Sequence, residues 1–274
     1  MKKMIMAVLL TAATTAFAQV KVSISGSDTL GGVMTDAIIA AGMNQKIAYT
    51  GGGSGVGEKA MANAEISITA MSREFKIEAI DLAKTKGIVP VGHVIALDGI
   101  GIFVNASNPT ASLDFVTLSK IFTCDITSWN QVPGSGKNGP IKAYRRNDQS
   151  GTTDTFKHLV GVKTFGACVT VVNETADIAD VTGNDADAVG YAGLSAMNTK
   201  NRTLAIAQKA GQSVVLPNTT TIRNGSYPLS RKLYIYEATG SKTAAGVEQE
   251  LLGYLLDRSF LDPIVQDHDF VTID

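Results

Sequence analysis

Three short segments combine glycine with serine and threonine hydroxyls, and one of them also carries an arginine. The strongest is residues 144–153, Tyr-Arg-Arg-Asn-Asp-Gln-Ser-Gly-Thr-Thr, in which Arg146 lies four residues before Ser150-Gly151-Thr152. A helix N-terminus exposes unpaired N–H groups and the positive end of a dipole, so it attracts anions. Hydroxyls add hydrogen-bond donors, and a guanidinium adds a planar fork suited to phosphate or sulfate. The chemistry predicted by this segment is the binding of an oxyanion.

The second segment, residues 25–30, reads Ser-Gly-Ser-Asp-Thr-Leu and follows an alternating, strand-like pattern. We expect the Thr29 hydroxyl and the backbone N–H groups of Thr29 and Leu30 to face the same anion. Ser27 and Asp28 belong to this turn, and an ordinary helix N-cap is the alternative explanation for both. The segment predicts a second group of donors in a different part of the chain.

The third segment, residues 51–57, reads Gly-Gly-Gly-Ser-Gly-Val-Gly. Glycines lose much conformational entropy on folding, so a run of them is expected where another group must approach the backbone closely. Ser54 would supply the hydroxyl donor of this turn. Ser72 and Arg73 end a later predicted strand and offer a further hydroxyl and guanidinium. A solvated arginine paired with a nearby glutamate explains Arg73 equally well.

One acidic residue lies inside the arginine-containing segment. Asp148 follows Arg146 by two positions and precedes Ser150 by two. We expect its carboxylate to pair with Arg146 and to fix the guanidinium for a ligand. The alternative is an exposed ion pair, which contributes only about 0–1 kcal/mol.

The sequence lacks the motifs that would make these turns part of an enzyme. The glycines of residues 51–57 do not match G-x-G-x-x-G in any register, and residues 134–138 do not match a P-loop. A nucleophile elbow at Ser54 would need glycine two positions later, where valine stands. We therefore expect a non-catalytic protein without a cofactor. A phosphatase or hydrolase using Ser54 or Ser150 is the alternative from another functional class.

The chain contains two cysteines, Cys124 and Cys168. In an oxidising compartment they could form one disulfide, and two buried free thiols are the other interpretation. Together with His93, His158 and His268 they show no spacing suited to zinc. We expect no metal site.

An alternation of strands and helices positions the three turns. Val20, Val22 and Ile24 alternate with polar residues like a half-buried strand, and apolar residues from Leu30 to Ala41 recur at helical spacing. This α/β order predicts mostly parallel sheets flanked by helices, with the turns at the carboxyl ends of strands. Further strands are expected at 47–50 and 66–70, and helices from the glycine turn to Asn63 and from Ser72, as N-cap, to Lys86.

A long extended run, residues 88–104, is apolar and is interrupted by Asp98-Gly99. Its length suits a strand that leaves one lobe and enters a second. We expect residues 19–97 to form the first lobe, 98–225 the second, and 226–274 a return to the first. The second lobe is predicted to contain a helix at 117–122, strands at 141–144 and 188–191, and a helix after Gly151. The returning tail is predicted to contain a strand at 231–236 and a closing helix at 243–256.

The N-terminal residues 1–18 have the pattern of an export signal. Lys2 and Lys3 precede an apolar stretch, and Ala16-Phe17-Ala18 forms a small-x-small cleavage site. Removing this segment leaves 22 basic and 25 acidic residues, a net charge of −3. A slightly acidic body argues against nucleic acid or an anionic membrane as a partner. We expect a periplasmic monomer that meets its anion at a local site.

Taken together, these motifs resemble those of a known family. Gly-Ser-Asp-Thr at 26–29, the glycine turn at 51–57, Ser72-Arg73, Arg146-x-x-x-Ser150-Gly151-Thr152, Ile121-Phe-x-x-x-Ile-Thr-x-Trp129 and Val189-Gly-Tyr191 occur in this order. The order is similar to that of the periplasmic phosphate-binding proteins of phosphate ABC transporters, which are type II periplasmic binding proteins. The resemblance implies a two-lobed α/β fold with a hinge, which closes over one inorganic phosphate and delivers it to an ABC permease. Carried over by position, the phosphate contacts would be Thr29, Leu30, Ser54, Arg146, Ser150, Gly151 and Thr152.

One position departs from the family pattern. Some members carry an aspartate after the serine of the third strand, where it accepts a proton from bound phosphate, and this chain has Arg73 there. A buried acceptor left facing a fully ionised sulfate costs about 1–3 kcal/mol, so such an aspartate discriminates against sulfate. Asp28 is the candidate that could take over this role. A receptor for another tetrahedral oxyanion, sulfate or molybdate, is the alternative to phosphate.

Overall fold

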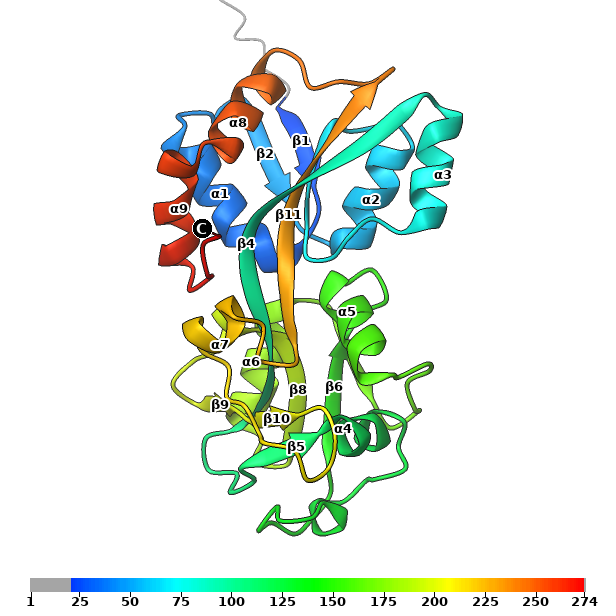
Figure 1. The fold of residues 1–274 in the computed structure, drawn as a ribbon, viewed down its shortest axis with the longest axis vertical. Coiled ribbons are helices and arrows are strands. Elements are labelled where there is room, and N and C mark those ends of the chain that lie inside the picture. Colours follow the sequence, from blue (N-terminus) through cyan, green and yellow to red (C-terminus); the bar gives the residue numbers. More distant parts are fainter. Residues whose placement is uncertain (1–20, 274) are drawn as a thin grey trace, which may run out of the picture.

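The structure, a computed structural model, describes residues 21–273, and the expected export signal at residues 1–18 lies outside them. Figure 1 shows two lobes joined by two long strands, β4 (Ile88–Asn105) and β11 (Ser230–Gly240). These strands pair antiparallel from Ile88 to Gly99 of β4. Within the described part of the chain, no helix has both the length and the apolar character needed to cross a bilayer.

The first lobe, at the top of Figure 1, contains both ends of the described chain. Its strands β1 (Val22–Ser25) and β2 (Ile47–Thr50) pair parallel, and β3 (Ile68–Met71) pairs antiparallel with β11. The core includes Val33 of one helix and Leu255 of another, both fully buried. The helices of this lobe are α1 (Gly31–Ala40), α2 (Ser54–Ala62), α3 (Ile77–Thr85), α8 (Val247–Leu256) and α9 (Arg258–Asp267), with a 3₁₀ turn, η1 (Asp28–Leu30), before α1.

The second lobe has parallel pairing at its centre. Strand β6 (Lys142–Arg146) lies between β7 (Thr170–Val172) and β8 (Ala188–Gly193), and β8 pairs antiparallel with β4. One sheet, in the order β3-β11-β4-β8-β6-β7, therefore runs through both lobes. The remaining elements are β5 (Ser112–Asp114), α4 (Phe115–Phe122), η2 (Trp129–Gln131), α5 (Gly151–Val160), α6 (Thr175–Asn184), η3 (Leu194–Ala196), β9 (Asn201–Thr203), β10 (Ala205–Ala207) and α7 (Thr219–Arg223).

Aromatic packing and a disulfide hold the second lobe together. The rings of Phe156 and Tyr191 stack with centroids 4.0 Å apart, and Phe122 meets Phe156 edge-on. Cys124 and Cys168 form a disulfide with an S–S distance of 2.02 Å. Of the two alternatives left open by the sequence, the bonded one is present in the structure.

Several elements differ from the sequence expectations for local physical reasons. The first helix begins at Gly31, because Asp28–Leu30 forms a separate 3₁₀ turn. Ser72 does not cap α3, whose N-cap is Lys76, because the Ser72 hydroxyl faces Ser54 instead. The sheet is less parallel than expected, because β4 and β11 pair antiparallel with each other and with their other neighbours. The elements α6, α9 and β7 were not predicted.

Candidate anion-binding site

The three predicted turns meet where the two lobes face each other. Thr29 lies in η1 and Ser54 begins α2, both in the first lobe, whereas Thr152 lies in the first turn of α5 in the second lobe. The Oγ1 atoms of Thr29 and Thr152 are 3.3 Å apart and both residues are buried. Segments separated by more than a hundred residues thus present hydroxyls to one another.

Arg146 is the most deeply placed cation of this region. It ends β6, and its side chain is only 2% exposed. Its Nη2 donates to Asp28 Oδ2 and its Nη1 donates to Thr175 Oγ1, each at 2.7 Å. Its Nε is buried without a hydrogen-bond partner, as is the hydroxyl of Ser27. A buried donor without an acceptor is costly, so an anion oxygen within hydrogen-bond distance of either atom would be stabilised.

The residue that orients Arg146 is Asp28, and the expectation for Asp148 is wrong. Asp28 Oδ1 accepts from the Gly52 N–H at 2.7 Å while Oδ2 holds Arg146, so the carboxylate joins both lobes. Asp148 instead pairs with Arg145 at 2.7 Å, and its side chain is 74% exposed. Strand β6 ends at Arg146, so Asp148 lies in the following turn, where its exposed carboxylate meets the guanidinium of Arg145, which is on the opposite face of the strand from Arg146.

The serines and Gly151 form a tight contact across the lobes. The Ser54 and Ser72 Oγ atoms lie 3.1 Å apart, and Ser54 Oγ also accepts from the Ser72 N–H at 3.0 Å. A Cβ at Gly151 would lie 2.3 Å from Ser54 Oγ, so only glycine fits there. Ser150 caps α5 by accepting from the Thr153 N–H at 3.3 Å. The structure therefore brings these predicted residues together at the start of α5.

The glycine turn also receives the backbone of the second lobe. Gly53 has a φ of 106°, and a Cβ on it would lie 2.3 Å from the carbonyl oxygen of Gln149. The neighbouring Gly55 N–H donates to that same oxygen at 2.9 Å. The close approach expected from the glycines is thus made by protein backbone. Leu30 is less available than expected, because its N–H donates to Ser27 O at 3.2 Å and its side chain is fully buried.

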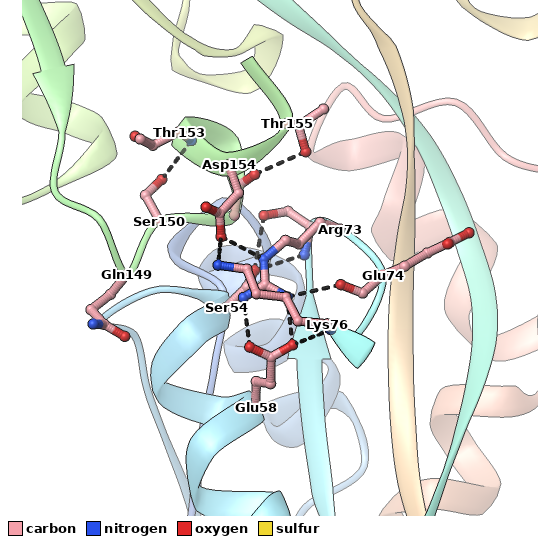
Figure 2. A network of polar contacts seen from close by, with 12 residues as sticks. Ser54, Glu58, Arg73, Glu74, Lys76, Gln149, Ser150, Thr153, Asp154 and Thr155 are labelled. Carbon is pink, nitrogen blue, oxygen red and sulfur yellow. Dashed lines mark hydrogen bonds and ion pairs between the residues drawn. The ribbon is translucent and has the colours of Figure 1, made fainter. Parts of the chain in front are cut away.

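Arg73 belongs to an ion-pair network beside the turns, and the expectation that it faces the anion is wrong. Figure 2 shows its guanidinium between Glu58 and Asp154. Nη1 and Nη2 donate to the two Glu58 oxygens at 2.7 and 2.8 Å, and Nε donates to Asp154 at 2.8 Å. Burial lowers the pKa of Arg73, but Glu58 and then Asp154 outweigh it and raise that pKa. Acids that satisfy the guanidinium in this way keep it from serving as a free donor.

The same network connects the lobes. Arg73 and Lys76 precede α3 in the first lobe, and Asp154 lies on α5 in the second. Asp154 Oδ2 is 2.8 Å from Arg73 Nε and 2.8 Å from Lys76 Nζ (Figure 2). We call Glu58, Arg73, Lys76 and Asp154 the Arg73 network.

A cavity of about 580 Å³ opens at the interlobe cleft and is lined by residues of both lobes. Asp28 and Gly52 line it from the first lobe, and Glu174 and Thr175 line it from the second. Two of these residues, Asp28 and Thr175, accept hydrogen bonds from Arg146, which lies behind them and does not itself line the cavity. Partial burial and the negative charge of Asp28 raise the pKa of Glu174. The cleft thus has an acidic entrance and a buried cation behind it.

Sequence reasoning missed a buried ion pair on the connecting strands. Arg231 of β11 donates to Asp98 Oδ2 of β4 from Nη2 at 2.6 Å and from Nε at 2.9 Å. Burial raises the pKa of Asp98, and the charge of Arg231 opposes that shift. The signal was present, because Asp98 interrupts an apolar run and a charge inside such a run must be compensated when buried. Among residues 21–273, no group of three or more His, Cys, Asp or Glu side chains is placed to hold a metal ion.

Comparison with known proteins gives both sequence and structural relatives. A profile of the PBP superfamily domain matches residues 11–258. Protein SphX of Synechococcus elongatus is 31% identical over 223 residues, which cover 77% of this chain and 66% of SphX. The phosphate-binding protein PstS of Pseudomonas aeruginosa is 28% identical over 260 residues, covering 88% of this chain and 80% of PstS.

Solved structures have the same two-lobed fold. A Clostridium perfringens protein crystallised with bound phosphate matches with a TM-score of 0.80 at 24% identity, covering 93% of this chain and 100% of that one. An ABC-type phosphate transport receptor from Vibrio cholerae matches with a TM-score of 0.72 at 21% identity, covering 92% of this chain and 100% of that one. The predicted fold class is confirmed.

Proposed function

Because this chain belongs to the PBP superfamily, a family of substrate-binding proteins, we propose that it captures inorganic phosphate and delivers it to a transmembrane ABC permease. The observation that carries the proposal is Arg146, a buried guanidinium at the lobe interface whose Nε has no partner. The name of the PstS relative, a phosphate-binding protein, supports phosphate as the ligand. The protein acts as a receptor and not as an enzyme.

The binding site of this proposal combines donors from both lobes. The second lobe contributes Arg146 and the start of α5, and the first lobe contributes hydroxyls of η1, α2 and the turn after β3. Charge-assisted hydrogen bonds contribute roughly 1.5–3 kcal/mol each, so a few of them support micromolar affinity, about −8 kcal/mol, after the cost of closure. The proposed contacts are Ser27, Thr29, Leu30, Ser54, Ser72, Arg146, Ser150, Gly151 and Thr152, with Asp28 orienting Arg146.

Closure of the lobes is the proposed mechanism of capture. The lobes are bridged by the Asp28–Arg146 ion pair and by the hydrogen bond from Gly55 to Gln149. Donors on both sides can replace the hydration shell of an anion only when the cleft is closed. A permease that contacts both lobes would then recognise the closed form. The proposal includes the lobe boundaries at 97/98 and 225/226, a periplasmic location after cleavage near Ala18, and a monomeric state.

Sulfate or molybdate is the second candidate ligand. Arg73 stands where some family members carry the acidic proton acceptor, and its donors are directed to Glu58 and Asp154. Asp28 is the carboxylate that we propose as the acceptor for a proton of the anion, because it bonds Arg146 directly. Phosphate remains the preferred ligand because an acidic acceptor favours a protonated anion.

Thermal unfolding with different anions tests this proposal. Phosphate at about a hundred times its dissociation constant should stabilise the folded protein and raise the melting temperature by roughly 5–10 °C. Sulfate and molybdate at equal ionic strength serve as controls and should leave the melting temperature nearly unchanged. A shift with sulfate or molybdate and none with phosphate would contradict the assignment of the ligand.

A further inference from the structure

We propose that Arg231 is a positioning residue for anion binding, which acts by turning the hydroxyl protons of Thr29 and Thr152 toward the ligand. The proposal rests on the proposed function above. Arg231 lies on β11, one of the two strands that join the lobes, and its side chain is 3% exposed. Neither the sequence motifs nor the family resemblance pointed to it.

The guanidinium of Arg231 has no donor left for an anion. Arginine carries five N–H groups. Nε donates to Asp98, and Nη2 donates to both Asp98 and Thr29 Oγ1, the latter at 3.3 Å. Nη1 donates to Thr152 Oγ1 at 2.8 Å and to the Ser72 carbonyl at 3.4 Å. These five hydrogen bonds, to four acceptor atoms, use all five N–H groups, so any effect of Arg231 on an anion must pass through its partners.

Arg146 differs from Arg231 in this respect. It also bonds an aspartate and a threonine, but its buried Nε has no partner. The two arginines thus have separate roles, Arg146 as a direct donor to the anion and Arg231 as a support for other donors.

The threonine hydroxyls gain a direction from this contact. A hydroxyl has one proton to donate and lone pairs that accept. When Arg231 donates to the oxygens of Thr29 and Thr152, their protons must point elsewhere. In this structure one of the two hydroxyls donates to the other across 3.3 Å. An anion that replaces this contact receives both protons, which disfavours a cation or a neutral donor as ligand. The bonds also hold two side chains from different lobes in one arrangement, so less rotamer freedom is lost when the anion binds.

The charge of Arg231 is compensated within the protein. Asp98, 1% exposed in its side chain, takes two of the five N–H groups. The pair is therefore neutral overall, as is the pair of Arg146 with Asp28, and the site's attraction for an anion comes from the free Nε–H donor of Arg146. This arrangement provides orientation without a net positive charge on Arg231.

A double-mutant cycle read by calorimetric titration with inorganic phosphate tests this role. The neutral pair Asp98→Asn with Arg231→Gln removes the directed donors without leaving a buried charge unpaired. We expect phosphate affinity to fall by about tenfold or more, because both hydroxyls lose their fixed orientation. We call Asp98→Asn with Arg231→Gln the arginine pair variant. Thr29→Val with Thr152→Val should lower phosphate affinity by a similar factor in the unsubstituted protein. In the arginine pair variant the same threonine substitutions should lower it by only roughly threefold or less, because linked groups do not contribute additively.

A matched control is available on α9. Arg258 and Asp262 form an ion pair of the same residue types in the first lobe, away from the cleft. Asp262→Asn with Arg258→Gln should leave phosphate affinity within about twofold of the unsubstituted protein, as expected for a partly exposed pair. Circular dichroism melts establish that each variant is folded.

Two results would overturn the proposal: phosphate affinity within threefold, roughly, of the unsubstituted value in the arginine pair variant, or fully additive losses in the cycle. If the pair variant does not fold, Arg231→Lys provides the same test. A lysine keeps the charge beside Asp98 but cannot donate to both threonines. An unsubstituted protein that binds no phosphate would instead overturn the proposed function, and this inference with it.

Discussion

Replacing Asp154 with asparagine should weaken phosphate binding without touching the anion. Asp154 is on α5 of the second lobe, and its carboxylate reaches Arg73 Nε and Lys76 Nζ of the first lobe, each at 2.8 Å. These contacts exist only while the lobes are together, so they stabilise the closed form relative to an open one. An observed dissociation constant depends on the fraction of protein in the binding-competent form. The loss of closed-state stability therefore appears as a loss of affinity.

The size of the effect follows from the exposure of the groups. The Asp154 side chain is 22% exposed, Arg73 is 9% exposed and Lys76 is 46% exposed. The Lys76 pair is largely solvated and contributes little, whereas the hydrogen-bonded Arg73 pair contributes more. We estimate about 1–2 kcal/mol for both, which corresponds to a roughly 5- to 30-fold weaker affinity for phosphate.

Calorimetric titration at two ionic strengths measures this effect. The control is Asp185→Asn, because Asp185 pairs with Lys142 at 2.6 Å inside the second lobe and bridges nothing across the cleft. The control should bind phosphate within about twofold of the unsubstituted protein. In about 1 M salt the difference caused by Asp154→Asn should shrink, since screening weakens exposed pairs. Unchanged affinity at low salt, or an equal loss in the control, would refute the reasoning.

Two further predictions concern pH and covalent stability. Glu174→Gln should bind phosphate more tightly than the unsubstituted protein at pH 7, because the pKa of Glu174 is raised by burial and by a neighbouring carboxylate across the cleft. Because this pKa is raised in the closed form, the contribution of protonated Glu174 to closed-state stability is present at low pH and is lost as the pH rises through that pKa. The ratio of the phosphate affinities of Glu174→Gln and the unsubstituted protein should therefore approach one near pH 4.5. A ratio that does not change with pH would contradict this prediction. Cys124→Ser with Cys168→Ser opens a crosslink of sequence separation 44 and should lower the free energy of unfolding by about 4 kcal/mol in urea titrations. Phosphate affinity should be the same in this double variant as in the unsubstituted protein. Equal free energies of unfolding for the double variant and the unsubstituted protein would show that the crosslink does not constrain the unfolded chain.

Local patterns in the sequence predicted the parts of the site that depend on local chemistry. The Ser150 cap, the helix after Gly151 and the close approach at residues 51–57 follow from the preferences of serine and glycine for particular backbone positions. The position of Arg146 at the end of a strand follows from the same kind of pattern. These features need no knowledge of which segments meet in space.

Partners distant in sequence could not be predicted. Asp28 pairs with Arg146 across 118 positions, whereas Asp148, two residues from Arg146, pairs with Arg145 because β6 ends at Arg146 and the following turn leaves the Asp148 carboxylate exposed. Nearness in sequence favoured the wrong aspartate.

Arg231 and Asp98 are 133 positions apart and meet because two long strands pair. The partner of a buried charge depends on the complete fold, and neither the composition nor the spacing of residues in the sequence specifies that fold. The same limit explains why Arg73 was expected at the anion although acids of two other elements take up its donors.

The most direct test of the account is calorimetric titration of the ligand-stripped protein with phosphate, compared between Arg146→Gln and Arg145→Gln. We expect one site of roughly micromolar affinity in the unsubstituted protein, a loss of at least about 100-fold in Arg146→Gln, and a change within about threefold in Arg145→Gln. Arg145 is the control because it pairs with Asp148 and lies over the ring of Phe165. Equal affinities of the two variants, or no phosphate binding by the unsubstituted protein, would contradict the central claim.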